Sequence, residues 1–360
     1  MPDELKPLPS DMDDAAEIAE YEQRLELNNL VAALTICAEA IDPDFRIMDE
    51  AAQRAKSSYF KYARASAWLG ALAVFFAILQ LSQLARGWSE AWSLPVGAWT
   101  LEGKWLLPAT EFLMAAAAVG VALVGLGGRK QQSWFLQRYQ AERLRLLKYH
   151  FLTRSQLWSG NEQTLEKCRL EVRAEVEEIM VSQYPELESW ISAGSVPEVL
   201  EAPELSDAEW RQFREYYLKK RLREQTEHFV SRLKDNVIQD NKTRILPSVL
   251  FFGSVAFVLA HFSIELVGTV NDSVGRGALL LAASLPGFGA VVRARRGVLE
   301  FARNASRCET TYHVLLKLGV RLRDASNIDV AFREIGFCEQ VLETDVREWL
   351  RLMVESEWFG

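Results

Sequence analysis

The sequence lacks most of the features by which an enzyme or a nucleic-acid-binding protein is identified. Its 360 residues contain four cysteines without a CxxC pair and four scattered histidines, so reduced structural thiols are expected and a zinc site is not. Acidic residues outnumber basic ones, 49 to 41, and no basic stripe is interleaved with aromatics, which argues against a nucleic acid polymer as partner. No G-x-S-x-G, H-E-x-x-H or Walker loop occurs. We therefore expect no enzymatic activity and no cofactor.

The sequence also lacks the patterns typical of a signal peptide and of a phosphate-binding loop. The amino-terminal segment MPDELKPLPSDMDD is acidic and has no apolar centre, so a cleavable signal peptide is not expected. The glycine-rich stretch GLGGRK at 125–130 follows an apolar run instead of a strand, so it predicts a small-residue helix exit and not a phosphate-binding loop.

Charge is also missing from four long stretches. The first, at about 66–85, has no ionisable residue, and the second, at about 106–127, has only Glu111. Two more follow at about 246–266 and 277–292. Twenty helical residues rise about 30 Å, which matches the hydrocarbon thickness of a bilayer. The sequence therefore predicts an all-α membrane protein with four transmembrane helices in two hairpins.

The distribution of positive charge predicts the orientation of these helices. The twenty residues beside each inner end of the four spans contain nineteen Lys and Arg in all, whereas the two outer loops contain three. Cytoplasmic flanks are enriched in Lys and Arg. We expect a multi-pass protein of the cell inner membrane, with both termini and long helical extensions in the cytoplasm.

The chain divides into two halves with one plan, in which approach helices, a hairpin, an exit helix and a terminal helix follow one another. The first half covers residues 1–192, the segment 193–205 (AGSVPEVLEAPEL) is a linker, and the second half covers 206–360. A capping box of Ser206 and Glu209 is predicted to open the second half. This plan predicts a duplicated unit whose two copies have diverged.

Polar groups inside the spans are candidates for lining a pore, because charge at membrane depth usually faces protein or water. Ser254, His261 and Glu265 fall on one face of the third predicted span, and Glu111 lies near the outer end of the second. In an oligomer, a ring of such carboxylates would attract cations to a pore mouth. The alternative is that Glu111 and Glu265 simply reach interfacial water.

Small residues in the second span predict close helix packing. Ala116 with Gly120, and Ala118 with Ala122, form small-xxx-small pairs that let helix backbones approach one another. These pairs favour a tight bundle, whether or not it conducts.

Three groups of residues resemble a known family. Tyr217, Arg221, Leu222, Gln225 and Phe229 precede the second hairpin; Glu339, Leu342, Glu343, Glu348 and Trp349 lie near the end of the chain; Trp134, Arg138, Ala141, Glu142 and Arg145 follow the first hairpin. This pattern is similar to the SLATT superfamily of bacterial two-transmembrane effectors, named for association with SMODS nucleotidyltransferases and SLOG nucleotide sensors. The chain departs from the family pattern in having two hairpins and no appended sensor domain.

The resemblance implies two tandem SLATT-like units and a pore-forming or membrane-perturbing effector of a nucleotide-regulated defence system. Its implied partners are the lipid bilayer, further copies of the chain, and a separate nucleotide sensor or nucleotide second messenger. A non-conducting membrane scaffold that recruits a cytoplasmic partner through its helical stalk is the alternative. A small transporter is a weaker one, because transporters place charged or unwound segments at the midplane and only His261 and the Pro286 region come near it.

Overall fold

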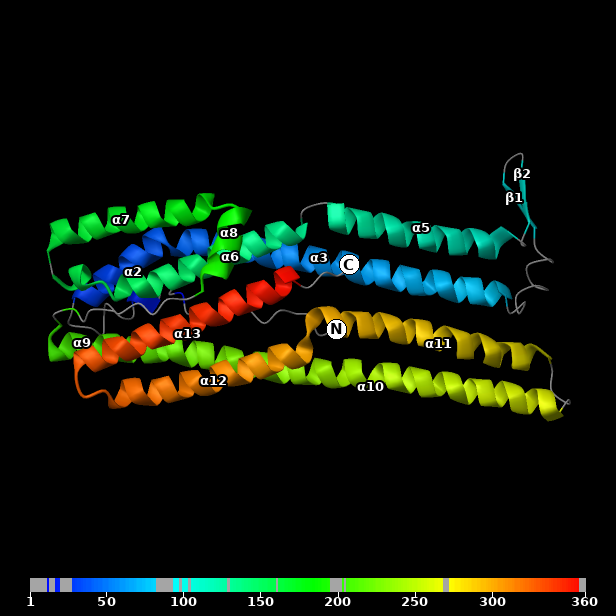
Figure 1. The fold of residues 1–360 in the computed structure, drawn as a ribbon. Helices are drawn as coiled ribbons and strands as arrows, with labels where there is room; N and C mark the ends of the chain where they lie inside the picture. Colours follow the sequence, from blue (N-terminus) through cyan, green and yellow to red (C-terminus); the bar gives the residue numbers. More distant parts are fainter. Residues whose placement is uncertain are drawn as a thin grey trace. The chain divides into compact units, whose positions relative to one another are not determined.

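The computed structural model describes residues 12, 17–19, 28–81, 93–96, 99–102, 105–127, 130–159, 161–194, 203, 205–267 and 272–355. Its elements are α2 (Asn28–Ala40), α3 (Asp42–Leu81), β1 (Ser93–Val96), β2 (Trp99–Glu102), α5 (Leu106–Gly127), α6 (Lys130–Leu152), η2 (Ser155–Ser159), α7 (Glu162–Val181), α8 (Tyr184–Ala193), α9 (Asp207–Tyr216), the π-helical η3 (Tyr217–Arg223), α10 (Glu224–Val267), α11 (Asp272–Leu299), α12 (Phe301–Asp324) and α13 (Ile328–Glu355). The prediction of a mainly helical chain is confirmed (Figure 1).

Contacts divide the chain into two compact units. Unit 1 comprises residues 1–56, 131–235 and 303–357, and unit 2 comprises residues 57–130, 236–302 and 358–360. Each of the two sequence halves, 1–192 and 206–360, contributes residues to both units, so the division by contacts differs from the predicted division into two tandem units. The tandem duplication stays a prediction.

Unit 1 has one apolar core to which both sequence halves contribute. Aromatic side chains join them: Trp158 of η2 packs edge-on against Phe213 of α9 at 5.5 Å, and Tyr149 of α6 packs against Tyr217 of η3 at 5.9 Å. Phe213 in turn stacks on Phe332 of α13 at 5.7 Å. Because this core draws on residues from both halves, neither half buries its apolar faces by itself.

Local sequence signals explain several helix boundaries. The predicted capping box is confirmed, since the Ser206 hydroxyl accepts from the Glu209 amide and the Glu209 carboxylate accepts from the Ser206 amide at 2.9 Å. The dipeptide Asp42-Pro43 also predicts a helix break, because proline has no backbone N–H and restricts the residue before it, and this break is confirmed: α2 ends at Ala40 and α3 begins at Asp42. Pro185 likewise predicts a helix end close to it, and α7 ends at Val181 while α8 begins at Tyr184 with Pro185 in its first turn. One break was not predicted: it lies at Glu300, whose φ of 41° separates α11 from α12.

Unit 2 contains the apolar part of the chain. Four helices among the described residues are long and apolar enough to cross a membrane. Large apolar side chains on them are exposed, as expected of lipid-facing surfaces; they include Phe112, Leu113, Val119, Leu123, Phe251, Phe252, Leu259 and Phe262. In Figure 1, α3 lies beside α5, and α10 lies beside α11. Within this unit, Trp68 and Phe75 of α3 pack near Phe288 of α11, with ring centroids 6.0 and 6.4 Å apart.

The segment between α3 and α5 differs from the sequence-based prediction. Residues 86–105 contain Trp88, Trp92, Trp99 and Trp105, and indole side chains favour the headgroup layer of a bilayer, so a short polar outer loop with tryptophan anchors is expected here. In the structure, β1 and β2 form an antiparallel pair in which Ser93 lies opposite Glu102 and Val96 opposite Trp99. The anchoring role of the tryptophans stays a prediction. Leu94, Val96, Trp99 and Leu101 favour extended backbone, which explains the short ladder. Of the four loop tryptophans, only the side chain of Trp105 is described, and it is exposed.

Candidate functional site

Glu111, the only charged residue in the apolar runs at 66–85 and 106–127, accepts a hydrogen bond from a neighbouring helix. Gln80 of α3 donates from Nε2 to Glu111 Oε2 of α5 at 2.6 Å. This hydrogen bond between two polar side chains links α3 to α5, two helices that are otherwise mainly apolar. The structure therefore gives Glu111 a role within the hairpin, beside the predicted role at a pore mouth.

Ser254 joins the two helices of the second hairpin. It is 8% exposed, and its hydroxyl donates to the Ala282 carbonyl of α11 at 2.6 Å. Ser66 does the same in the first hairpin, where its hydroxyl donates to the Ala118 carbonyl of α5 at 3.0 Å. Each hairpin therefore has one serine on its first helix that bonds to an alanine carbonyl on its second helix.

His261 lies against α11 where that helix begins. A methyl group placed on Gly275 would lie 3.4 Å from His261 Nδ1 and 3.7 Å from Ile264 Cγ2, so the absence of a side chain at Gly275 brings its backbone close to the imidazole. The Glu265 side chain lies outside the described part of the chain. The structure thus places His261 and Ser254 toward α11, and the predicted pore-lining face stays a prediction.

The small residues of α5 differ in their surroundings within this single chain. Ala118 is buried, and its carbonyl is the one that accepts from Ser66. Ala116 and Gly120 are exposed, and no atom lies within 4 Å of a methyl group placed on Gly120. Ala122 is half-buried. The close approach of α5 to α3 therefore runs through Ala118, while the Ala116–Gly120 pair faces away from it.

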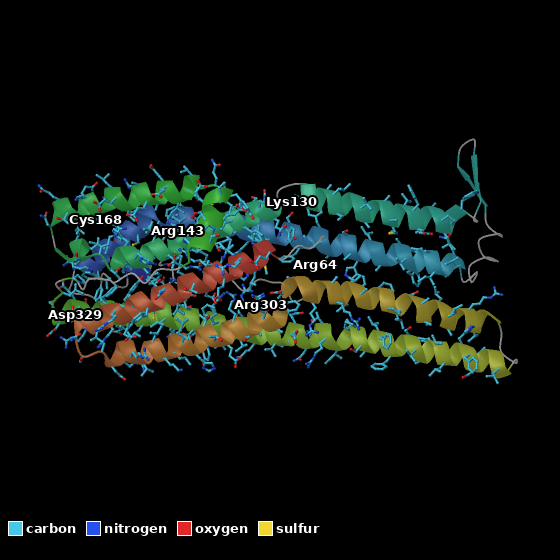
Figure 2. The ribbon with its side chains drawn as sticks, in the orientation of Figure 1. Arg64, Lys130, Arg143, Cys168, Arg303 and Asp329 are labelled. Carbon is cyan, nitrogen blue, oxygen red and sulfur yellow. The ribbon has the colours of Figure 1, made fainter. Side chains whose placement is uncertain are left out.

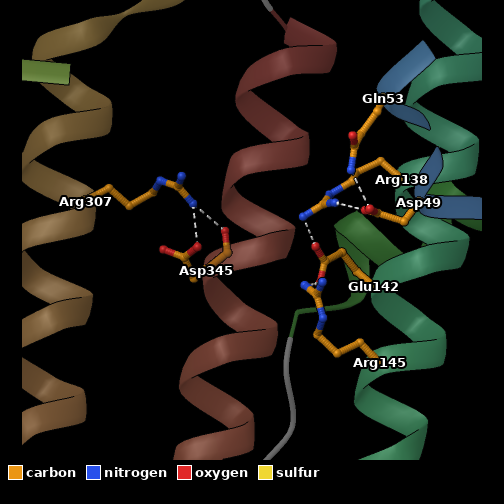
Figure 3. Close-up of polar contacts among 7 residues, drawn as sticks. All are labelled: Asp49, Gln53, Arg138, Glu142, Arg145, Arg307 and Asp345. Atoms are coloured by element: carbon orange, nitrogen blue, oxygen red, sulfur yellow. Dashed lines mark hydrogen bonds and ion pairs between the residues drawn. The ribbon is translucent and has the colours of Figure 1, made fainter. Parts of the chain in front are cut away.

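In unit 1, buried charged residues form a network that connects α3 to α6. Arg138 of α6 donates to Asp49 of α3 at 2.8 Å and also pairs with Glu142 one turn further on. Glu142 accepts from Arg145 at 2.8 Å, and Gln53 donates to the second oxygen of Asp49 at 2.6 Å. Figure 3 shows these side chains converging from the two helices. Buried charges are stable only when paired in this way.

A separate buried ion pair connects α12 to α13. Arg307 Nη1 donates to Asp345 Oδ2 at 2.8 Å, and the Thr311 hydroxyl donates to Asp345 Oδ1 at 3.0 Å (Figure 3). Burial raises the pKa of Asp345 to about 6, against the opposing effects of Arg307 and Thr311. Burial, together with the nearby Arg138, lowers the pKa of Arg232 of α10.

The most deeply buried ion pair connects η3 to α13. Arg221 donates from Nε and Nη2 to the two oxygens of Glu339, at 3.0 and 2.6 Å, and the Tyr217 hydroxyl donates to Oε1 at 2.6 Å. The Arg221 guanidinium also lies over the Tyr149 ring, 4.2 Å from its centroid. Burial and the Glu339 charge raise the pKa of Tyr217 well above its usual value, so its hydroxyl stays a donor.

Unit 1 also has a polar pocket of about 800 Å³. Its lining includes Arg143, His150, Glu178 and Trp190. Its Arg154 is paired with Glu175 at 2.6 Å, and Arg347 with Glu343 at 2.5 Å. Figure 2 places Arg143 on α6 and Cys168 on the neighbouring α7. The wall of the pocket therefore carries charges of both signs, and at least two of its arginines are paired with glutamates of the same wall.

The motif residues identified in the sequence include several members of these networks, but the pairs that they form were not predicted. Arg138, Glu142, Arg145, Arg221 and Glu339 belong to the motifs, whereas Asp49, Arg307 and Asp345 do not. A signal for Asp345 was present: Ile335, Cys338, Leu342 and Asp345 follow helical spacing on the buried face of α13. A charged residue in an apolar stripe predicts a buried partner.

No family model, no curated protein and no solved structure matches this chain. Among the described residues, no group of His, Cys, Asp and Glu side chains could hold a metal ion.

Proposed function

We propose that the chain is a membrane effector of a bacterial nucleotide-regulated defence system, which oligomerises in the inner membrane and opens a pore or perturbs the bilayer when it is activated. The observation that carries the proposal is the distribution of the helices between the two units. Helices α3 and α10 contribute residues to both the charged unit 1 and the apolar unit 2. A signal received in unit 1 can then reach the apolar helices along an unbroken backbone.

Several features of unit 1 support a receiving role. Its buried ion pairs tie together helices that continue into the apolar helices or follow them: Asp49 is on α3, Arg138 on α6, and Arg307 on α12. Breaking a buried pair by removing one partner is costly, so such pairs favour discrete arrangements of helices over continuous deformation. The resemblance to two-transmembrane effectors supplies the nucleotide-based signal and the defence context.

The alternative function, a non-conducting membrane scaffold, has an observation in its favour. The polar side chains expected to line a pore are engaged inside the hairpins, Glu111 with Gln80 and Ser254 with the Ala282 carbonyl. In such a scaffold, these bonds fix the hairpins, and unit 1 recruits a cytoplasmic partner.

Reconstitution of the full-length chain tests the proposal. The protein is incorporated into liposomes that contain a self-quenched dye, and leakage is recorded with and without candidate nucleotide second messengers. Leakage or single-channel conductance under an activating condition, together with growth arrest on overexpression, supports the effector. Intact vesicles and unaffected growth under every condition favour the scaffold.

A charge substitution then tests the pore mouth. If Glu111 and Glu265 attract cations, Glu111→Gln/Glu265→Gln lowers cation-over-anion permeability several-fold while leaving conductance measurable, because glutamine still bonds to Gln80. The measurement is the reversal potential in a salt gradient. Unchanged selectivity removes the two carboxylates from the conduction mechanism.

A further inference from the structure

Helices α3 and α11 of unit 2 face each other through aromatic side chains. Phe288 of α11 packs against both Trp68 and Phe75 of α3, with ring centroids 6.0 and 6.4 Å apart. Beside it, a methyl group placed on Gly287 would lie 4.0 Å from Val74. The two helices run in opposite directions (Figure 1), and Phe288 is level with a point about midway between Trp68 and Phe75.

This register brings positive charges together where the apolar segments end. Arg295 follows Phe288 by seven residues, which places it on the same helix face about 10 Å further along. On α3, Lys61 and Arg64 precede Trp68 by seven and four residues and share its face. Arg64 is therefore level with Arg295 on the facing helix, and Lys61 lies one turn away. We call Lys61, Arg64, Trp68, Phe288 and Arg295 the α3–α11 seam.

Positive charges on facing helix surfaces repel each other, so an anion between them stabilises the arrangement. The carboxylates at this end of unit 2 are placed elsewhere among the described residues. Asp240 of α10 pairs with Arg296 at 3.0 Å, and Glu300 lies beyond the end of α11, more than one turn past the seam. Arg64 Nε donates to the Phe60 carbonyl of its own helix at 3.2 Å, a bond that holds the guanidinium without neutralising it. An external anion is thus the complementary ligand of the seam.

The side of the seam towards the apolar segments is open and apolar. Trp68 is 49% exposed although it packs against Phe288. Leu72 and Leu281, which share these two helix faces, are exposed as well. Indole rings favour the headgroup layer of a bilayer. The anion that fits this position is therefore one that is attached to an apolar chain, and not a free ion in water.

We propose that the α3–α11 seam binds the headgroup of an acidic phospholipid, with its phosphate between Arg64 and Arg295. The acyl chains then lie along the exposed Trp68, Leu72 and Leu281. A guanidinium binds phosphate through two parallel N–H···O bonds, and basic pockets between membrane helices recognise acidic headgroups by the same chemistry. The site requires a bilayer around the apolar helices and does not depend on whether they conduct.

Lipid binding to the full-length protein tests the proposal. The protein is purified in a neutral detergent and titrated with phosphatidylglycerol, or with phosphatidylcholine of the same acyl chains, and bound lipids are counted by native mass spectrometry. Wild type is expected to bind one phosphatidylglycerol per chain about tenfold more tightly than phosphatidylcholine, because only the former has a net negative charge. Equal affinity for the two lipids overturns the proposal.

Matched charge removals locate the site. Arg64→Gln/Arg295→Gln should lower the affinity for phosphatidylglycerol about tenfold, to that for phosphatidylcholine. Lys242→Gln/Arg244→Gln removes the same charge from exposed positions of α10 at the same end of the apolar segments, and should keep the preference of wild type. Equal losses in the two double variants would show a general attraction to this basic end and would overturn a site in the seam.

Two further measurements decide the case in which Arg64→Gln/Arg295→Gln does not fold. Lys61→Gln changes an exposed side chain and should weaken phosphatidylglycerol binding about threefold. An unchanged affinity of the folded Lys61→Gln protein overturns the proposal. Excess inorganic phosphate should leave the bound lipid in place, because it has no acyl chain to contact the apolar side of the seam. Displacement of the lipid by phosphate would assign the seam to a free anion and would overturn the lipid.

Discussion

Arg221 and Glu339 form an ion pair in which each side chain is only 2% exposed. We expect Arg221→Met alone or Glu339→Gln alone to lower the free energy of unfolding by about 3–5 kcal/mol, because each leaves a buried partner unmatched. The double variant Arg221→Met/Glu339→Leu should recover most of this loss. Denaturant unfolding of the full chain in detergent, followed by circular dichroism, measures these differences.

The matched control for this pair is Glu50 with Arg54, an i,i+4 pair on α3 whose side chains are 72% and 76% exposed. Replacing either residue by alanine should have no measurable effect, because water already solvates both charges. If the Arg221 and Glu339 single variants behave like this control, the buried pair is not a determinant of the fold of unit 1.

Asp345 makes a separate prediction for global stability. Because its pKa is raised to about 6 in the folded protein, ionisation at neutral pH costs stability, by an upper limit of about 3 kcal/mol. Asp345→Asn should therefore raise the thermal unfolding midpoint at pH 8 and leave it almost unchanged at pH 5. A variant that is less stable than wild type at both pH values would show that the ion pair with Arg307 is favourable overall.

At the scale of the helical element, the two hairpins use the same bond. Ser66 donates to the Ala118 carbonyl and Ser254 to the Ala282 carbonyl. We expect Ser66→Ala and Ser254→Ala each to destabilise the protein by about 0.5–1.5 kcal/mol, the range measured for hydrogen bonds between membrane helices. Thermal unfolding in detergent should resolve the double variant most clearly.

Ser263 supplies the control for this prediction. Its hydroxyl donates to the Leu259 carbonyl of its own helix at 2.8 Å and is exposed, so Ser263→Ala should be nearly neutral. Equal effects of Ser254→Ala and Ser263→Ala would mean that the bond between α10 and α11 contributes little.

The helices could be predicted from the sequence, whereas the side-chain contacts between them could not. Apolar runs of membrane length, the break at Asp42-Pro43 and the capping box at Ser206 are local signals, and each corresponds to an observed element or boundary. The Arg221–Glu339 pair joins residues 118 positions apart, and Gln80 with Glu111 joins residues 31 apart. Such contacts depend on which helix faces are brought together, and periodicity along a single helix does not specify that.

Two local features were also missed, because the residue types at these positions suit more than one backbone conformation. The break at Glu300 is set by one residue with a positive φ, and glutamate gives no indication of this conformation. The ladder of β1 and β2 lies in a segment rich in tryptophan and glycine, a composition that also suits an interfacial loop. Residue type alone therefore did not decide between a continuous helix and a break at Glu300, or between a loop and a strand pair at 93–102.

At the scale of the whole molecule, the average composition conceals the four long apolar helices. The mean hydropathy is −0.05, typical of a soluble protein, yet the described residues contain four helices apolar enough to cross a membrane. The charged helices of unit 1 balance those of unit 2 in this average. Hydropathy calculated over short windows along the chain distinguishes the apolar helices from the charged ones. The orientation of the predicted spans depends on the charges beside them.

The predicted orientation can be tested with single cysteines, because Cys37, Cys168, Cys308 and Cys338 are all buried and give little background labelling. In right-side-out membrane vesicles, an impermeant maleimide should label Ser93→Cys and Asp272→Cys. It should reach Ser159→Cys and Ser206→Cys only after the membrane is permeabilised.

The physical reason for this expected labelling is the excess of Lys and Arg at the four inner flanks, which opposes their translocation. Since Ser206 caps α9, Ser159→Cys is the safer of the two inner positions. Labelling of both inner positions in sealed vesicles, with unmodified protein as the control, would reverse the topology and place unit 1 outside the cytoplasm.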